Sequence, residues 1–196
     1  RCVDIPYATK IPAKACVTPW RVDERNGLVF VWHDPCGGEP DWRIPEIPEY
    51  GRPDWTPWHG KRIEIKTHPR EIVDNLADRA HFAPVHRTEI LDFKFEVDRK
   101  IAIQRAQGKA FLPGGGVDQF SSTTTYHGPG YLLMKMDGAL KNYMLIGHTL
   151  NDENTLDLRL GVTLKIVGAP GRPVQPGDRA RTEGYVGQYM ANLKAG

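Results

Sequence analysis

Six short runs rich in β-branched and aromatic residues follow one another after Thr88, and they limit what this chain can fold into. Turn sequences separate the runs, among them Gly-Pro-Gly at 128–130 and Asn-Asp at 151–152. Short β-rich runs alternating with turn residues predict an antiparallel meander. The runs span residues 93–97, 101–106, 121–126, 131–136, 143–150 and 156–166.

Helical patterns flank the predicted sheet on both sides in the sequence. Proline is tolerated in the first turn of a helix and an acidic residue complements the helix dipole there, so Pro69 and Glu71 predict a helix start. Another helix is expected over residues 179–194, and residues 61–66 alternate with period two, as a strand does. The expected fold is therefore α+β: a curved antiparallel sheet with flanking helices.

The first third of the chain has a different character. Two β-rich runs, 14–20 and 28–33, are joined by residues 24–27, which end in Asn-Gly and so predict a hairpin. Residues 34–60 then contain six prolines, which cannot occupy the interior of a β-ladder, and three tryptophans. We expect an ordered connector here, held in place by its indoles, and the main domain boundary.

Composition excludes several classes of protein. A length of 196 residues suits one sizeable domain, and 26 Lys+Arg against 24 Asp+Glu without a basic run argues against nucleic-acid binding. The longest apolar run, 27–32, is far too short to span a bilayer. Three cysteines without metal-ligand spacing favour a reducing cytoplasm. The chain opens without Met and ends inside a helical pattern, so we expect an internal piece of a longer protein.

An amide, a carboxylate and two imidazoles stand close together as Asn75, Asp78, His81 and His86. On a regular helix the first three step by three residues along one face. The two histidines are five residues apart, about 140° around the axis, so an undistorted helix cannot aim both at one ion. Pro84 between them is expected to kink the helix and swing His86 toward His81. Two imidazoles without a cysteine favour iron or zinc.

Other interpretations stay open at this point. The polar residues of this segment lie away from its apolar stripe and are also compatible with an ordinary solvated face. A zinc hydrolase is weaker, because the spacing is not His-Glu-x-x-His. A third possibility is a non-catalytic β-cup that binds an apolar ligand, with purely structural histidines. Of the five histidines without a partner at ligand spacing, only His127 and His148, on predicted strands, could line a pocket. The five are His33, His59, His68, His127 and His148.

The spacing Asn-x-x-Asp-x-x-His-x-x-x-x-His resembles the mononuclear iron motif of Rieske-type non-haem iron oxygenases. Residues 1–15 and 26–33 look like the end of a Rieske domain, just after its second cluster-binding pair. The sequences Ile-Pro-Tyr-Ala at 5–8 and 187–196 are most similar to the oxygenase component of bacterial 3-ketosteroid 9α-hydroxylase. The resemblance implies three parts. These are a Rieske end (1–35), a connector (36–60) and a C-terminally truncated mononuclear iron catalytic domain (61–196).

The resemblance also implies roles for the motif. His81 and His86 would be two iron ligands, Asp78 would link the iron to a neighbouring subunit's Rieske cluster, and Asn75 would lie beside the iron. The family's third ligand, an Asp, would fall beyond Gly196. Because a histidine that binds a metal usually donates its other ring N–H to a carboxylate, a carbonyl or water, we expect Asp78 also to orient His81 by accepting that bond.

The third ligand and the cluster are expected outside this chain. Asp178 and Glu183 do not match the position of the third ligand. No Cys-x-His or Cys-x-x-His pair is present, so the [2Fe–2S] cluster would belong to a missing N-terminal part.

The implied activity is O₂-dependent hydroxylation of a hydrophobic polycyclic substrate, a 3-ketosteroid at C9. The alternative is desaturation or O-demethylation of another sterol or aromatic compound. Electrons would come from NAD(P)H through a flavin and iron–sulfur reductase, and the subunits would form a homotrimer. Residues 131–136 and 143–148, with Met134, Met136 and Met144, are expected to wall the substrate pocket.

Overall fold

The computed structural model describes residues 2–17, 19–111, 116–128, 130–168 and 172–192. The chain separates into two compact units, Arg1–Tyr50 and Gly51–Gly196. The three-part division expected from the sequence stays a prediction. Within the described ranges, no helix is long and apolar enough to cross a membrane.

The first unit contains a β-hairpin formed by β1 (Arg21–Arg25) and β2 (Leu28–Trp32). Asn26 and Gly27 form the turn with φ angles of 53° and 70°. Both angles are positive, as a two-residue hairpin turn requires. The predicted hairpin is confirmed, but its first strand was placed wrongly at 14–20. A two-residue turn pairs the residues that flank it directly, so the strand must end at the turn.

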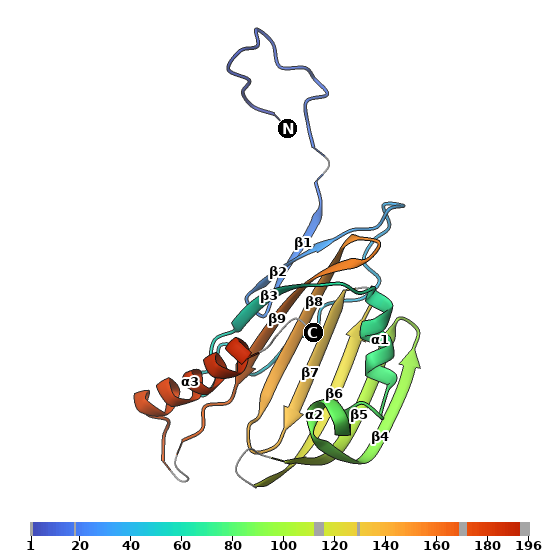
Figure 1. Ribbon diagram of the computed structural model, residues 1–196. Coiled ribbons are helices and arrows are strands. Elements are labelled where there is room, and N and C mark those ends of the chain that lie inside the picture. The colour runs from blue at the N-terminus through green and yellow to red at the C-terminus, as the bar shows by residue number, and fades with distance from the viewer. Residues whose placement is uncertain (1, 18, 112–115, 129, 169–171, 193–196) are drawn as a thin grey trace. The chain divides into compact units, whose positions relative to one another are not determined.

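The second unit is built on a seven-stranded antiparallel sheet (Figure 1). Its order is β3-β9-β8-β7-β6-β5-β4, so each strand from β4 to β9 pairs with the next and β3 joins beside β9. The two edges, β3 and β4, do not pair, and the sheet stays open. The predicted meander is confirmed. The strands are β3 (His59–Ile65), β4 (Thr88–Asp98), β5 (Ile101–Phe111), β6 (Val117–His127), β7 (Tyr131–Asp137), β8 (Asn142–Asp152) and β9 (Thr155–Leu164).

Two short helices, α1 (Pro69–Ala77) and α2 (Phe82–His86), lie over the β4 end of the sheet (Figure 1). Leu76 of α1 is only 4% exposed and forms a buried cluster with Ala102, Tyr126 and Leu132 of three successive strands. This contact fixes α1 on one face of the sheet.

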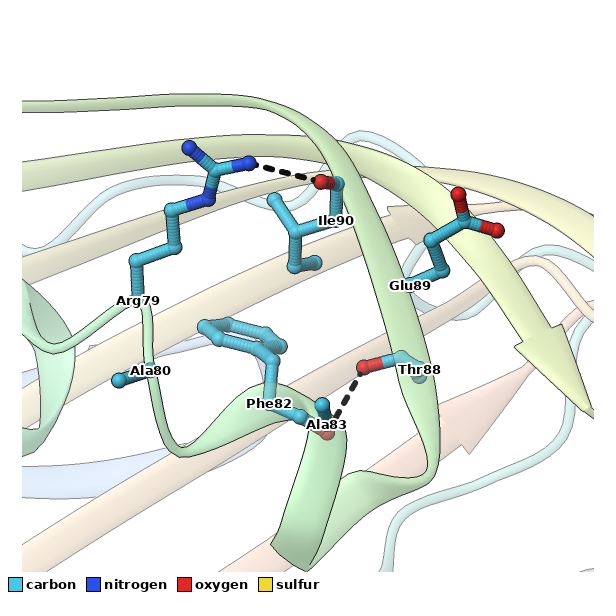
Figure 2. Close-up of a pocket in the computed structure, with 7 residues that line it drawn as sticks. All are labelled: Arg79, Ala80, Phe82, Ala83, Thr88, Glu89 and Ile90. Carbon is cyan, nitrogen blue, oxygen red and sulfur yellow. Dashed lines mark hydrogen bonds between the residues drawn. The ribbon is translucent and has the colours of Figure 1, made fainter.

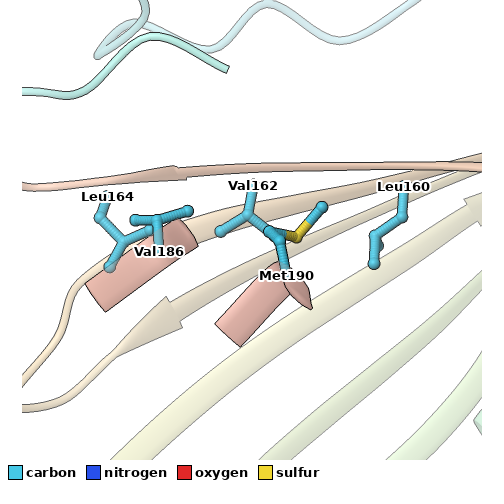
Figure 3. Packing of buried hydrophobic residues seen from close by; sticks show 5 residues of the cluster. All are labelled: Leu160, Val162, Leu164, Val186 and Met190. Atoms are coloured by element: carbon cyan, nitrogen blue, oxygen red, sulfur yellow. The ribbon is translucent and has the colours of Figure 1, made fainter. Parts of the chain in front are cut away.

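The long helix α3 (Pro176–Asn192) packs near the opposite edge. Val186 and Met190 lie against Leu160, Val162 and Leu164 of β9, as Figure 3 shows. Strand partners share a face of a sheet.

Register shows that α1 and α3 cover the same face. Tyr126 pairs with Leu132, Leu132 with Ile146, and Ile146 with Leu160, so the two clusters lie on one side. Ile146 packs against both clusters. Met134 pairs with Met144 on the same face, between the two helical regions.

Candidate metal centre

The segment that carries the motif begins as the sequence predicts. Pro69 is the first residue of α1, and the His68 side chain accepts a hydrogen bond from the Arg70 backbone N–H at 3.2 Å. This bond satisfies one of the donors that a helix start leaves free. The apolar stripe is shorter than expected, because Ala77 and Ala80 are exposed and Ala80 lies beyond the helix end.

The chain between the two helices breaks at Asp78, not at Pro84. Asp78 has an extended backbone (φ −81°, ψ 109°), and its carboxylate accepts a hydrogen bond from the Ala80 N–H at 2.7 Å. An aspartate that bonds to the backbone two residues ahead favours a turn over a helix. The expected kink at Pro84 is therefore wrong. Pro84 is the third residue of α2. The first four N–H groups of a helix have no partner within the helix, so the N–H that proline lacks is not needed at this position.

This break brings His81 and His86 together. Their ring centroids are 5.0 Å apart and their planes meet at 74°. The two rings are therefore close together, and two helices with a break between them take the place of the single kinked helix that was expected. That both rings bind one metal ion stays a prediction. The Phe82 ring lies 4.5 Å from that of His81 and 6.2 Å from that of Phe93, so it packs the pair against β4.

A backbone bond selects the tautomer of His81. Nδ1 of His81 lies 2.7 Å from the carbonyl oxygen of Asp78, which can only accept, so Nδ1 carries the proton. The lone pair of Nε2 is left for a metal ion. The Asp78 carboxylate, expected to orient the ring, is 3.7 Å away and bonds to Ala80 instead. The backbone carbonyl of Asp78 performs the orienting role, which is an alternative that metal sites commonly use.

The donor set fits two of the ligands of a mononuclear metal. The pKa of His86 lies below its ordinary value, because packing partly desolvates the ring and His81 is a neighbouring cation when protonated. A lowered pKa keeps the imidazole neutral, as a ligand must be. Among the residues that the structure describes, no third His, Cys, Asp or Glu joins the pair. Asn75 is exposed on α1 and the Asp78 side chain is 50% exposed, so both face outward.

Two side chains that the motif does not include fasten the segment to β4. Arg79 donates from Nη2 to the Ile90 carbonyl at 2.9 Å, and the Thr88 hydroxyl donates to the Phe82 carbonyl at 3.1 Å. Figure 2 shows both bonds, with the Phe82 ring between them. The sequence analysis missed both residues. No motif spacing signals them, because each side chain donates a hydrogen bond to the backbone carbonyl of a separate segment.

These residues line a shallow pocket of 380 Å³ between α2 and β4 (Figure 2). Its walls do not include Met134, Met136 or Met144, so the expected pocket over β7 and β8 stays a prediction.

His127 lies on β6 and His148 on β8, outside the segment that carries the motif. His148 Nε2 is 3.0 Å from the Tyr126 hydroxyl, and burial lowers the pKa of His148. Because His127 directly follows Tyr126 along β6, it faces the other side of the sheet. The two histidines therefore do not share one pocket.

Comparison with known proteins places the chain in one family. Residues 31–193 match the 3-ketosteroid 9alpha-hydroxylase C-terminal domain. The chain belongs to this family. The 3-ketosteroid-9-alpha-monooxygenase oxygenase component of Mycobacterium tuberculosis is 34% identical, over 99% of this chain and 54% of that protein. One from Rhodococcus rhodochrous is 40% identical, over 68% of this chain and 37% of that protein.

Solved structures confirm the architecture. Apo dicamba monooxygenase superposes with a TM-score of 0.65 at 17% identity, over 100% of this chain and 69% of that one. At that identity the likeness shows the fold, which is the open antiparallel sheet of Rieske oxygenase catalytic domains. The family resemblance and the fold class expected from the sequence are thus confirmed. The chain spans about a third to a half of the length of its 3-ketosteroid monooxygenase relatives.

Proposed function

We propose that this chain is the catalytic part of the oxygenase component of a Rieske-type monooxygenase, with His81 and His86 as two ligands of a mononuclear Fe(II). The observation that carries the proposal is the pair of rings 5.0 Å apart, with His81 Nδ1 bonded to the Asp78 carbonyl. Family membership supports the same assignment.

The metal and the protein have separate tasks in this proposal. Fe(II) held by two imidazoles and a carboxylate leaves open positions for O₂ beside the substrate. The third ligand would be the Asp that the resemblance to the family implies. The Asp78 carbonyl keeps the proton of His81 on Nδ1, and Phe82 holds both rings against β4. The exposed Asp78 carboxylate faces the surface through which electrons would arrive.

The substrate is a flat hydrophobic polycycle, which we propose to be a 3-ketosteroid hydroxylated at C9. The names of the relatives and the apolar face between α1 and α3, where Met134 and Met144 pair, support this choice. The remaining parts are a [2Fe–2S] Rieske cluster upstream of this chain, a flavin and iron–sulfur reductase that draws on NAD(P)H, and a homotrimer. Another sterol or aromatic substrate, desaturated or O-demethylated, is the alternative that product analysis would reveal.

Metal analysis and product analysis of the full-length protein test the proposal. We expect about one mononuclear iron per subunit beyond the cluster, and reductase-dependent hydroxylation of a 3-ketosteroid. His86→Ala should lose the mononuclear iron and the activity while it keeps the Rieske absorption. His33→Ala is the matched control, because this histidine stacks on Trp20 in the other unit and should change neither.

Three outcomes would contradict the proposal. Zinc in place of iron would indicate a hydrolase. A metal-free protein that binds an apolar ligand would indicate a β-cup with structural histidines. Iron that persists in His86→Ala would remove this residue from the site.

A further inference from the structure

The inward face of β5 carries one polar residue between two small ones. Ala102, Gln104 and Ala106 are all buried and alternate along the strand, so they share the face of the sheet on which Ala102 packs with Leu76 of α1. The alanines leave room on either side of Gln104, whose side chain is long enough to reach the helix above.

Gln104 reaches the end of α1. Its Nε2 donates to the Leu76 carbonyl at 2.8 Å, and its Oε1 accepts from the Thr124 hydroxyl at 3.4 Å. Gln104 and Thr124 are each 4% exposed, so water does not replace either bond. Because a carbonyl only accepts and the Thr124 proton needs an acceptor, the two partners fix which way the amide points.

The Leu76 carbonyl is the one that most needs this partner. The last four carbonyls of a helix have no partner within it. At the end of α1, the Asp78 N–H donates a hydrogen bond to the Asp74 carbonyl, and the Gln104 side chain donates one to the Leu76 carbonyl. The helix can therefore end at Ala77, directly before the extended backbone of Asp78, while the buried carbonyl of Leu76 keeps a partner.

We propose that Gln104, held by Thr124, is a positioning residue for the His81 and His86 pair. It satisfies the end of α1, and so stabilises the break at Asp78 that turns the two imidazoles toward each other. This inference rests on the proposed metal site. Gln104 acts through Leu76 and Asp78 and does not itself approach the metal.

Cobalt(II) titration of the metal-depleted full-length protein tests the proposal, because visible absorption bands report both affinity and ligand geometry. The variants are Gln104→Leu, which removes donor and acceptor, and Gln104→Glu, which keeps the shape but loses the donor. We expect both to raise the cobalt Kd about tenfold, at the lower end of the effect of outer-shell partners. Their bands should also shift.

Two controls separate positioning from general stability. Gln107→Leu alters an exposed glutamine on the opposite face of β5 and should leave the Kd unchanged. Leu160→Ala should lower the denaturant midpoint through the α3 cluster, with the cobalt Kd and bands unchanged. A purely structural role for Gln104 would make its variants behave as Leu160→Ala does.

The outcomes are distinct. Wild-type Kd and bands in Gln104→Leu overturn the inference and leave the metal site standing. If the Gln104 variants do not fold, Thr124→Val tests the inference, because it removes the hydroxyl that holds Gln104. A rise in the cobalt Kd smaller than that expected for the Gln104 variants supports the inference, and an unchanged Kd overturns it. A wild-type protein that binds cobalt no better than His81→Ala overturns the proposed function, and the inference with it.

Discussion

Gly108 offers the sharpest test of how the sheet holds the motif segment. It lies on β5 opposite Ile90, where a bulge between Ile90 and Asp92 shifts the register of β4. A methyl group on Gly108 would stand 2.3 Å from the Glu89 carbonyl oxygen and 3.3 Å from the Ile90 Cα. These are backbone atoms, so no side chain can move aside.

The size of the effect follows from these distances. Ordinary contact begins near 3.4 Å, so the Glu89 carbonyl would have to move by about 1 Å, the difference from 2.3 Å. Overpacking of this kind costs about 1–3 kcal/mol. We expect Gly108→Ala to lower the free energy of unfolding by about 2 kcal/mol. Because Thr88 and Ile90 flank the displaced carbonyl, the metal affinity of the His81 and His86 pair should also fall.

Urea denaturation of the full-length protein measures the first effect and cobalt titration the second. Gly60→Ala is the matched control, since it is also a strand glycine but its added methyl group would lie 3.6 Å from the Leu160 carbonyl. The control should unfold at or slightly above the wild-type midpoint, because alanine restricts the unfolded chain. Equal midpoints for the two variants would refute the reasoning.

Three further predictions concern charge, acid stability and assembly. Asp78→Asn should keep iron, because the backbone carbonyl at this position still accepts the bond from His81 Nδ1. It should largely lose turnover, because the carboxylate charge is gone. Near-normal turnover with the reductase would exclude Asp78 from electron transfer. Hydrogen bonds from Arg172 and from the Gln175 N–H lower the pKa of Asp178 from 3.8 to about 2. The ionised Asp178 therefore stabilises the folded state fully above pH 3.8, and this stabilisation is lost as the pH falls from 3.8 to about 2. Asp178→Asn should therefore flatten the acid unfolding curve in that window, followed by circular dichroism, and an unchanged slope would contradict this. Light scattering on the full-length protein should report a trimer, and an active monomer would rule out an inter-subunit electron route.

The sheet could be predicted because its signals are local. Each strand from β4 to β9 is a β-rich run, and Gly128 lies in the turn between β6 and β7 as predicted. The turn predicted at Asn151 and Asp152 was placed wrongly, because both residues belong to β8 and the turn is formed by Glu153 and Asn154. The strand ends differ more from the prediction, since β4 begins at Thr88, five residues before the predicted start. Pairing with β5 extends a strand beyond the part that its own composition favours.

The position of the helix break could not be predicted in the same way. Pro84 looked like the breaker because proline disrupts a helix interior, yet it is equally compatible with a first turn. What decides between the two is Asp78, whose side chain turns the backbone at Ala80, together with the long-range contacts of Arg79. Those contacts involve a strand that comes later in the chain, and no motif spacing encodes them.

The candidate site therefore depends both on local backbone geometry and on long-range contacts with the sheet. The tautomer of His81 depends on a carbonyl three residues earlier and is set by local backbone geometry alone. The approach of His86 depends on where α2 lies, and the Thr88 hydroxyl of β4 bonds to the carbonyl of Phe82 at the start of α2. In our proposal Gln104 of β5 contributes from the end of α1, through its bond to the Leu76 carbonyl. Substitutions at Thr88 or Gln104 should consequently alter the spacing of the two ring nitrogens while His81 keeps its proton on Nδ1. Metal affinity and ligand-field bands would then change together, although no substituted residue touches the metal.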